Sequence, residues 1–167
     1  MIIIYTSNTG NTQEYAMMLR DALDLPAYKL GEAPAQVAGA DAIFLGWIMA
    51  GGLVGYAPAA KKYHVVCAVG VGMSPESEAQ TKTLAEKIKA PEGMPVFYLQ
   101  GGYDKKKLKG FNKAVMSVVE KTIMKRLEGL PEAEKTENPV YKMITEGYSV
   151  VSKERLQPVI DWYGDRG

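Results

Sequence analysis

Short apolar runs alternate with segments of helical periodicity along the chain, and this alternation restricts the fold more than any other feature of the sequence. The apolar runs fall at residues 2–6, 27–30, 42–48, 65–71 and 96–100. Strands that alternate with helices are typical of βαβ units around a parallel sheet. The sequence therefore predicts one domain over residues 1–167, built as a three-layer α/β/α sandwich with a five-stranded parallel sheet.

The segments between and after these runs predict the helices. Ser74 offers an N-cap hydroxyl and Pro75 suits the first helical position, so a helix is expected from there to Lys89. The other helices are expected from about Thr12 to before Pro26, over 111–127, over 139–147 and over 153–163.

Charge and cysteine content exclude several classes of protein. The formal net charge is +1, whereas nucleic-acid-binding proteins usually carry a large basic surplus, so no nucleic acid is expected. The single cysteine, Cys67, cannot form an intrachain disulfide and has no metal-ligand spacing around it. The N-terminal run does not read as a signal peptide, and no stretch approaches the ~20 apolar residues that span a bilayer. We therefore expect a cytoplasmic protein without a metal site.

The segment between the first strand and the first helix is dense in hydroxyl and amide side chains. Residues 6–12 read TSNTGNT and contain no Lys or Arg. Backbone N–H groups and hydroxyls at a helix N-terminus bind anions. A nucleoside-triphosphate loop needs GxxxxGK[ST] and a dinucleotide loop needs GxGxxG, and neither pattern is present. The segment suits a terminal phosphate monoester, and the alternative is a polar turn that only caps the helix.

This segment resembles the [ST]-x-T-G-x-T phosphate loop of the flavodoxins, and the strand spacing and later loops extend the resemblance over most of the chain. The resemblance implies a flavin mononucleotide (FMN) cofactor and a sheet in the order 2-1-3-4-5. It also implies that hydroxyl, amide and backbone donors of the loop hold the FMN phosphate. The candidate residues are Ser7, Asn8, Thr9, Gly10, Asn11 and Thr12.

Two later loops match the flavin-contacting loops of that family. The resemblance places residues 46–52 along one face and the N5 edge of the flavin, and residues 70–74 against its pyrimidine edge. The candidates are Trp47, Ile48, Met49, Ala50 and Gly51 in the second loop and Gly70, Val71, Gly72 and Met73 in the third. Gly51 is the candidate for tuning the flavin potential through a peptide flip, or else part of a flexible turn. Trp47 is a candidate for flavin contact or for core packing.

The loops also depart from those of flavodoxins that only carry electrons. The second loop reads Met49-Ala50 where an aromatic residue is usual, and the third lacks an acidic residue and a tyrosine. An uncovered flavin face would admit a substrate. Gly101-Gly102-Tyr103-Asp104 and the cationic segment after it resemble the menaquinone-dependent protoporphyrinogen oxidase branch of the superfamily. That branch has a long insert near strand 5, whereas only residues 103–110 separate Gly102 from Phe111.

Three functions fit these features. The first is an FMN-dependent oxidoreductase that passes electrons or hydride to a quinone or another flat conjugated acceptor, with no catalytic residue assigned to the protein itself. The second is a non-enzymatic electron carrier that docks on redox partner proteins. The third is a module that has lost FMN, which the dense phosphate loop disfavours. His64 is expected to be structural and Cys67 to be a buried, inert thiol.

Although the net charge of the chain is small, one segment is strongly basic. Residues 104–128 contain eight basic and three acidic residues, a balance of +5, and the rest of the chain carries −4. This segment is either a solvated cationic face or a contact surface for an anionic substrate, an acidic partner or an anionic membrane. The residues expected to make that contact are Lys105, Lys106, Lys107 and Lys109.

Overall fold

The computed structural model describes residues 1–103 and 110–166. The chain divides into two compact units, the first formed by Met1–Gly101 with Val150–Gly167 and the second by Gly102–Ser149. The second unit is thus inserted, along the chain, between two segments of the first. The expectation of one domain over 1–167 stays a prediction, because a division by contacts does not say whether each part folds alone.

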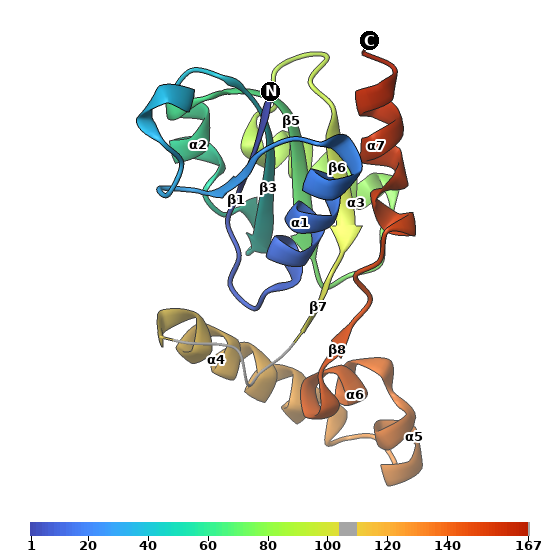
Figure 1. Ribbon diagram of the computed structural model, residues 1–167. Coiled ribbons are helices and arrows are strands. Elements are labelled where there is room, and N and C mark those ends of the chain that lie inside the picture. The colour runs from blue at the N-terminus through green and yellow to red at the C-terminus, as the bar shows by residue number, and fades with distance from the viewer. Residues whose placement is uncertain (104–109, 167) are drawn as a thin grey trace. The chain divides into compact units, whose positions relative to one another are not determined.

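The first unit contains a parallel sheet with the strand order β2-β1-β3-β5-β6 (Figure 1). The strands are β1 (Ile2–Tyr5), β2 (Ala27–Lys29), β3 (Asp41–Met49), β5 (His64–Gly72) and β6 (Val96–Gln100). A two-residue strand, β4 (Gly52–Leu53), pairs antiparallel with β3. The predicted α/β class with five parallel strands is confirmed. The sheet differs in detail from the expected order because it also contains β4.

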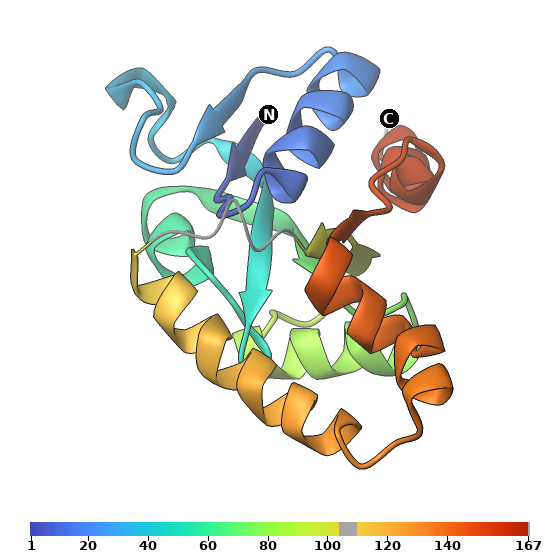
Figure 2. The same ribbon diagram turned by 90° about the horizontal axis from the view of Figure 1, so that it is seen from below.

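Helices cover both faces of this sheet and enclose two hydrophobic clusters (Figures 1 and 2). The helical segments are α1 (Asn11–Leu23), α2 (Tyr56–Lys62), α3 (Glu78–Ile88), α7 (Gln157–Gly164) and the 3-10 turns η1 (Ala35–Val37) and η3 (Glu154–Leu156). One cluster joins α1 and α7 to Ile3, Ile43 and Val69. The other joins α2 and α3 to Ile4 and Phe44. Alternate strand residues therefore face opposite helix layers, which explains why the central strands are continuously apolar.

The helix after β5 begins later than predicted. Its N-cap is Ser77, whose Oγ accepts a hydrogen bond from the Gln80 N–H at 3.2 Å. Ser74, the expected N-cap, instead donates its N–H to the Tyr98 hydroxyl at 3.1 Å. The segment before α3 is tied to β6 by this bond and by a bond from the Gln100 N–H to Glu76, so it cannot enter the helix.

The second unit contains a short antiparallel pair and three helices. These are β7 (Gly102–Tyr103), β8 (Tyr148–Ser149), α4 (Gly110–Leu127), α5 (Glu132–Glu137) and α6 (Pro139–Glu146). The predicted helices over 111–127 and 139–147 correspond to α4 and α6. Tyr103 and Glu120 are buried and hydrogen-bonded to each other, and Ile144 is buried as well. Within the described ranges, no helix is both long and apolar enough to cross a bilayer.

Candidate functional site

The loop between β1 and α1 leaves the start of α1 without a side-chain cap. Gly10 is the N-cap residue, its φ is +103°, and a Cβ built there would meet nothing within 4 Å. Ser7 Oγ accepts the Gly10 N–H at 3.2 Å, so this hydroxyl closes the loop rather than capping the helix. The first N–H groups of a helix have no intrahelical acceptor and attract anions. The start of α1 is therefore a candidate site for an anionic group.

The predicted cofactor residues fall at the carboxyl ends of neighbouring strands. Tyr5 pairs in register with Leu45, and Trp47 pairs with Val71, so β1, β3 and β5 end at the same edge. The strand order reverses between β1 and β3, where open α/β sheets bind their ligands. The first predicted loop, residues 6–12, therefore lies at the same edge of the sheet as the predicted cofactor residues at the ends of β3 and β5.

Gly101 lies between two of these predicted segments. A Cβ added to Gly101 would lie 3.2 Å from Asn11 Cβ and 2.6 Å from Val71 Cγ1. The phosphate-loop candidate Asn11 and the third-loop candidate Val71 thus approach the same point at the end of β6. A glycine is needed there because any side chain would collide with Val71.

The second predicted loop is a hairpin rather than a loop beginning at Gly46. β3 continues through Met49, the chain reverses at Ala50 and Gly51, and Gly52 pairs with Met49. The φ angles of Ala50 and Gly51 are +49° and +77°. Two successive positive φ angles are typical of a tight hairpin turn, and the sequence Ala-Gly is a weak signal for it. The hairpin was not predicted, because Met49 ends an apolar run and the residues after it do not form a second apolar run. The contact of this segment with a flavin stays a prediction.

Trp47 lies beyond the hydrophobic core. It has the same parity along β3 as Ile43 and Leu45, which belong to the α1 and α7 cluster. Trp47 itself is partly exposed, and within the described ranges neither core cluster includes it. Its Cα pairs with Val71, a third-loop candidate. Of the two expectations for Trp47, packing into the hydrophobic core is therefore wrong. Trp47 lies at the carboxyl edge of the sheet, on the face that α1 covers.

The third predicted loop is mostly strand. β5 runs to Gly72, and only Met73 and Ser74 follow it. A Cβ at Gly72 would lie 2.1 Å from the Tyr98 hydroxyl oxygen, and a Cβ at Gly70 would lie 2.4 Å from Leu84 Cδ2. These glycines are therefore required by the packing of β6 and α3 against β5, a reason that the G-x-G spacing alone did not reveal.

Sequence reasoning missed a hydrogen-bond network at the end of β6. Gln100 uses its N–H with the Glu76 carboxylate at 2.9 Å, its carbonyl with the Tyr15 hydroxyl at 2.6 Å, and its side-chain amide with the Met73 carbonyl at 3.1 Å. We call these residues, with Arg155, the Gln100 network. The partners lie far apart in the sequence, and no local motif marks them.

The network sets the ionisation of two of its members. Partial burial raises the pKa of Glu76, but the bonds from Arg155 and from the Gln100 N–H outweigh it, so the pKa lies below its ordinary value. Burial raises the pKa of Tyr15 to about 12, so its hydroxyl stays protonated and donates to Gln100. The network therefore fixes the end of β6 and the Met73 carbonyl through two bonds to the Glu76 carboxylate and two neutral hydrogen bonds.

The remaining candidate residues either lie where the sequence predicted or fall outside the described residues. His64 begins β5 at the edge opposite the predicted flavin loops and is exposed, with Nδ1 2.7 Å from Asp41 Oδ1. Cys67 is buried, as expected, and burial raises the pKa of its thiol, which supports the expectation that the thiol is inert. Lys105, Lys106, Lys107 and Lys109 lie outside the described residues. Within the described ranges, no group of acidic, histidine or cysteine side chains could hold a metal ion.

Comparison with known proteins adds no identity. Neither a protein-family model nor a curated protein matches the sequence. The geometry at the carboxyl edge of the sheet is therefore the basis for any functional conclusion.

Proposed function

We propose that the chain is a flavodoxin-like, FMN-binding redox protein. The observation that carries the proposal is the start of α1, which is rich in hydroxyls, has no side-chain cap, and lies where the strand order reverses. A neutral loop at a helix N-terminus suits a phosphate monoester, because hydrogen bonds and the helix dipole can offset its charge. The fold class and the residues at the carboxyl edge support the same reading.

Each predicted segment has a role in this proposal. Ser7, Thr9 and Thr12 supply hydroxyls, and Asn8, Gly10 and Asn11 supply amide or backbone donors, to the phosphate. Trp47 and the Ala50-Gly51 turn border the ring on the side of β3, and residues 70–73 border its pyrimidine edge. The Gln100 network holds Met73 in place through the Gln100 side-chain amide. Bound FMN would supply the electron or hydride transfer, which none of these side chains performs.

We favour an FMN-dependent oxidoreductase over an electron carrier. The turn after β3 presents Ala50 and Gly51, which are too small to cover a flavin face, so a flat acceptor such as a quinone has room to stack. The alternative is a carrier that docks on protein partners. Both forms are proposed to be cytoplasmic, and the basic segment at residues 104–128 is the proposed contact with an anionic membrane or an acidic partner.

A redox assay with a small quinone tests the enzyme against the carrier. FMN-loaded protein is reduced photochemically without oxygen and mixed with an excess of menadione. An oxidoreductase is reoxidised rapidly in a two-electron step, and one equivalent of menadione is reduced per bound FMN. Slow reoxidation by menadione, with rapid electron transfer to redox proteins only, would favour the carrier. Absence of FMN from protein loaded with it and then desalted would reject both.

A further inference from the structure

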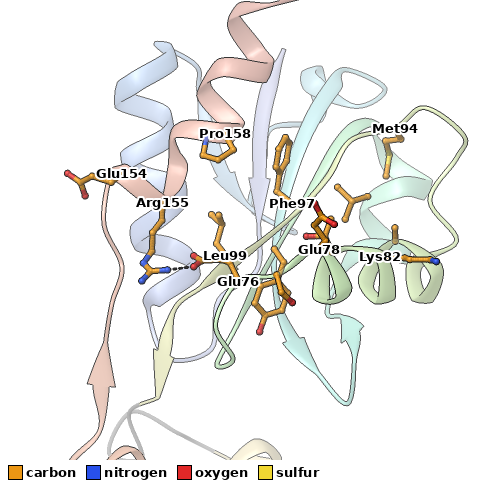
Figure 3. Close-up of a pocket in the computed structure, with 14 residues that line it drawn as sticks. Glu76, Glu78, Lys82, Met94, Phe97, Leu99, Glu154, Arg155 and Pro158 are labelled. Atoms are coloured by element: carbon orange, nitrogen blue, oxygen red, sulfur yellow. Dashed lines mark hydrogen bonds and ion pairs between the residues drawn. The ribbon is translucent and has the colours of Figure 1, made fainter. Parts of the chain in front are cut away.

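The outer edge of β6 forms the floor of a hollow that none of the predicted cofactor residues lines. Its volume is about 700 Å³, within the range of small-molecule sites. The floor is formed by Val96, Phe97, Tyr98 and Leu99, and the two walls are α3 and the segment from η3 into α7. We call this site the β6 hollow (Figure 3). All of its lining residues belong to the first unit.

The surface of the β6 hollow is largely apolar and includes aromatic rings. Phe97 packs against Trp162 of α7, with ring centroids 6.4 Å apart, so the Phe97 ring is held from behind. Leu99 continues the floor beside Phe97, and Pro158 lies near both on the wall formed by η3 and α7 (Figure 3). A flat or branched apolar group of a ligand would therefore meet a preformed surface.

The charges around the β6 hollow are not balanced. Arg155 is paired with Glu76, so its charge is already compensated. A hydrogen bond from its own backbone N–H, and then one from the Ser152 hydroxyl, lower the pKa of Glu154, so that carboxylate is engaged within its own turn. Figure 3 shows the Glu78 carboxylate beside Phe97, whereas the Lys82 side chain points away from Phe97. In the part of the chain that the structure describes, Glu78 forms no ion pair.

We propose that the β6 hollow binds a small organic cation that combines one ammonium group with an aromatic or branched apolar body. The ammonium lies against Glu78, and the apolar body lies on Phe97, Leu99 and Pro158. A carboxylate at the mouth of an apolar hollow attracts a cation and repels an anion, and the low polarity of the floor strengthens both effects. This site is separate from the proposed FMN site and does not depend on it.

Calorimetric titration of the full chain tests the proposal with three probes of one shape. The probes are 2-phenylethylamine, 2-phenylethanol and phenylacetate, which differ only in carrying a cation, a neutral group or an anion. The amine should bind at one site, the alcohol about fivefold more weakly, and the acid without measurable heat, because one partly exposed charge pair contributes at most about fivefold in affinity. Equal binding of amine and alcohol, or no binding of the amine, would overturn the proposal.

Two variants, compared with one control variant, assign the binding to the β6 hollow. Glu78→Gln should weaken the amine about fivefold and leave the alcohol unchanged, while Glu92→Gln removes the same charge from an exposed turn and should change neither. Ala85→Phe places a ring in the hollow and should abolish binding of both. Equal effects of Glu78→Gln and Glu92→Gln would refute the proposal, as would binding of acetyl-Phe-Lys-amide without binding of the free amine, which would indicate a peptide partner instead.

Discussion

Ser7 and Thr9 lie two residues apart in the loop after β1, but their hydroxyls have different surroundings. Ser7 Oγ accepts the Gly10 N–H and so takes part in closing the loop. Within the described residues, the Thr9 hydroxyl forms no hydrogen bond, and its side chain is partly exposed. We therefore expect the Thr9 hydroxyl to bind a ligand. The Ser7 hydroxyl is expected both to bind the ligand and to close the loop.

The substitution Thr9→Val removes a single hydroxyl and so tests ligand binding without disturbing the bond that closes the loop. A hydrogen bond to a charged phosphate contributes roughly 1.5–3 kcal/mol, so FMN affinity should fall by at least about tenfold. The free energy of unfolding without FMN should change little, because no described partner is lost. Thr83→Val, on the exposed face of α3, is the matched control and should leave FMN affinity unchanged. Equal affinities of the two variants in a fluorescence titration would remove Thr9 from the phosphate site.

Glu76 gives the molecule a pH-dependent contribution to stability. Its pKa is lowered in the folded state, since the bonds from Arg155 and Gln100 outweigh its desolvation. The stabilisation is therefore complete above the ordinary pKa of a glutamate and is lost as the pH falls through the lower folded value. Because the ion pair is partly exposed, the contribution at neutral pH is about 1 kcal/mol.

Urea unfolding of Glu76→Gln across this pH range measures the effect. The variant should be less stable than the parent chain at neutral pH and should approach it as the carboxylate of the parent is protonated. Glu92→Gln should follow the parent chain at every pH, because Glu92 is exposed. A stability difference for Glu76→Gln that stays constant from neutral to acidic pH would show that Glu76 does not titrate as described.

At the scale of elements, the sequence predicted the parallel strands well and the connections poorly. The strand over 96–100 was predicted at its observed bounds, and the other four parallel strands within two residues, because buried parallel strands are continuous apolar runs. The hairpin of β3 and β4 was missed because it depends on two positive φ angles that the sequence Ala50-Gly51 does not clearly predict. α2 was missed because its seven residues include a proline and show no apolar period.

The hairpin turn supplies a test of the proposed flavin contact. Gly51 has a φ of +77°, whereas Gly52 does not have a positive φ and a Cβ there would make ordinary contact with the Met49 carbonyl. Gly51→Ala should therefore cost roughly 1–2 kcal/mol of stability, because alanine is strained in the left-handed region. If the Ala50-Gly51 peptide contacts the flavin, Gly51→Ala also shifts the midpoint potential of bound FMN.

Gly52→Ala is the control for that measurement, since it adds the same methyl group one residue away without the strain. Spectroelectrochemistry of both FMN-loaded variants compares their midpoint potentials. A shift in Gly51→Ala with none in Gly52→Ala is the expected result. Equal potentials would mean that the hairpin turn does not contact the flavin, even if FMN binds.

For the whole molecule, the sequence identified a candidate loop after β1 but did not indicate the inserted unit. The candidate phosphate loop directly follows the first apolar run, so a local pattern in the sequence was enough to single it out. Of the helices in residues 102–149, α4 and α6 were predicted and α5 was not, and the division into two units depends on tertiary contacts that periodicity does not report. The sequence pattern therefore did not reveal that α4, α5 and α6 belong to a separate compact unit.

The first unit should fold without the second. Both hydrophobic clusters consist of residues of the first unit alone. The chain ends left by removing residues 102–149 are already close, because the Val150 N–H donates to the Gly101 carbonyl at 2.8 Å. A variant in which a short glycine linker replaces residues 102–149 should unfold cooperatively in urea and retain FMN binding. A non-cooperative transition would show that the first unit depends on the second.

The central claim is that the start of α1 holds the phosphate of FMN, and a comparison of FMN with riboflavin tests it most directly. The flavin-free full chain is titrated with each compound while flavin fluorescence is recorded. FMN should bind with one equivalent per chain, and riboflavin, which has the same ring but no phosphate, should bind at least about tenfold more weakly. Equal affinity for the two compounds, or no binding of FMN, would contradict the account.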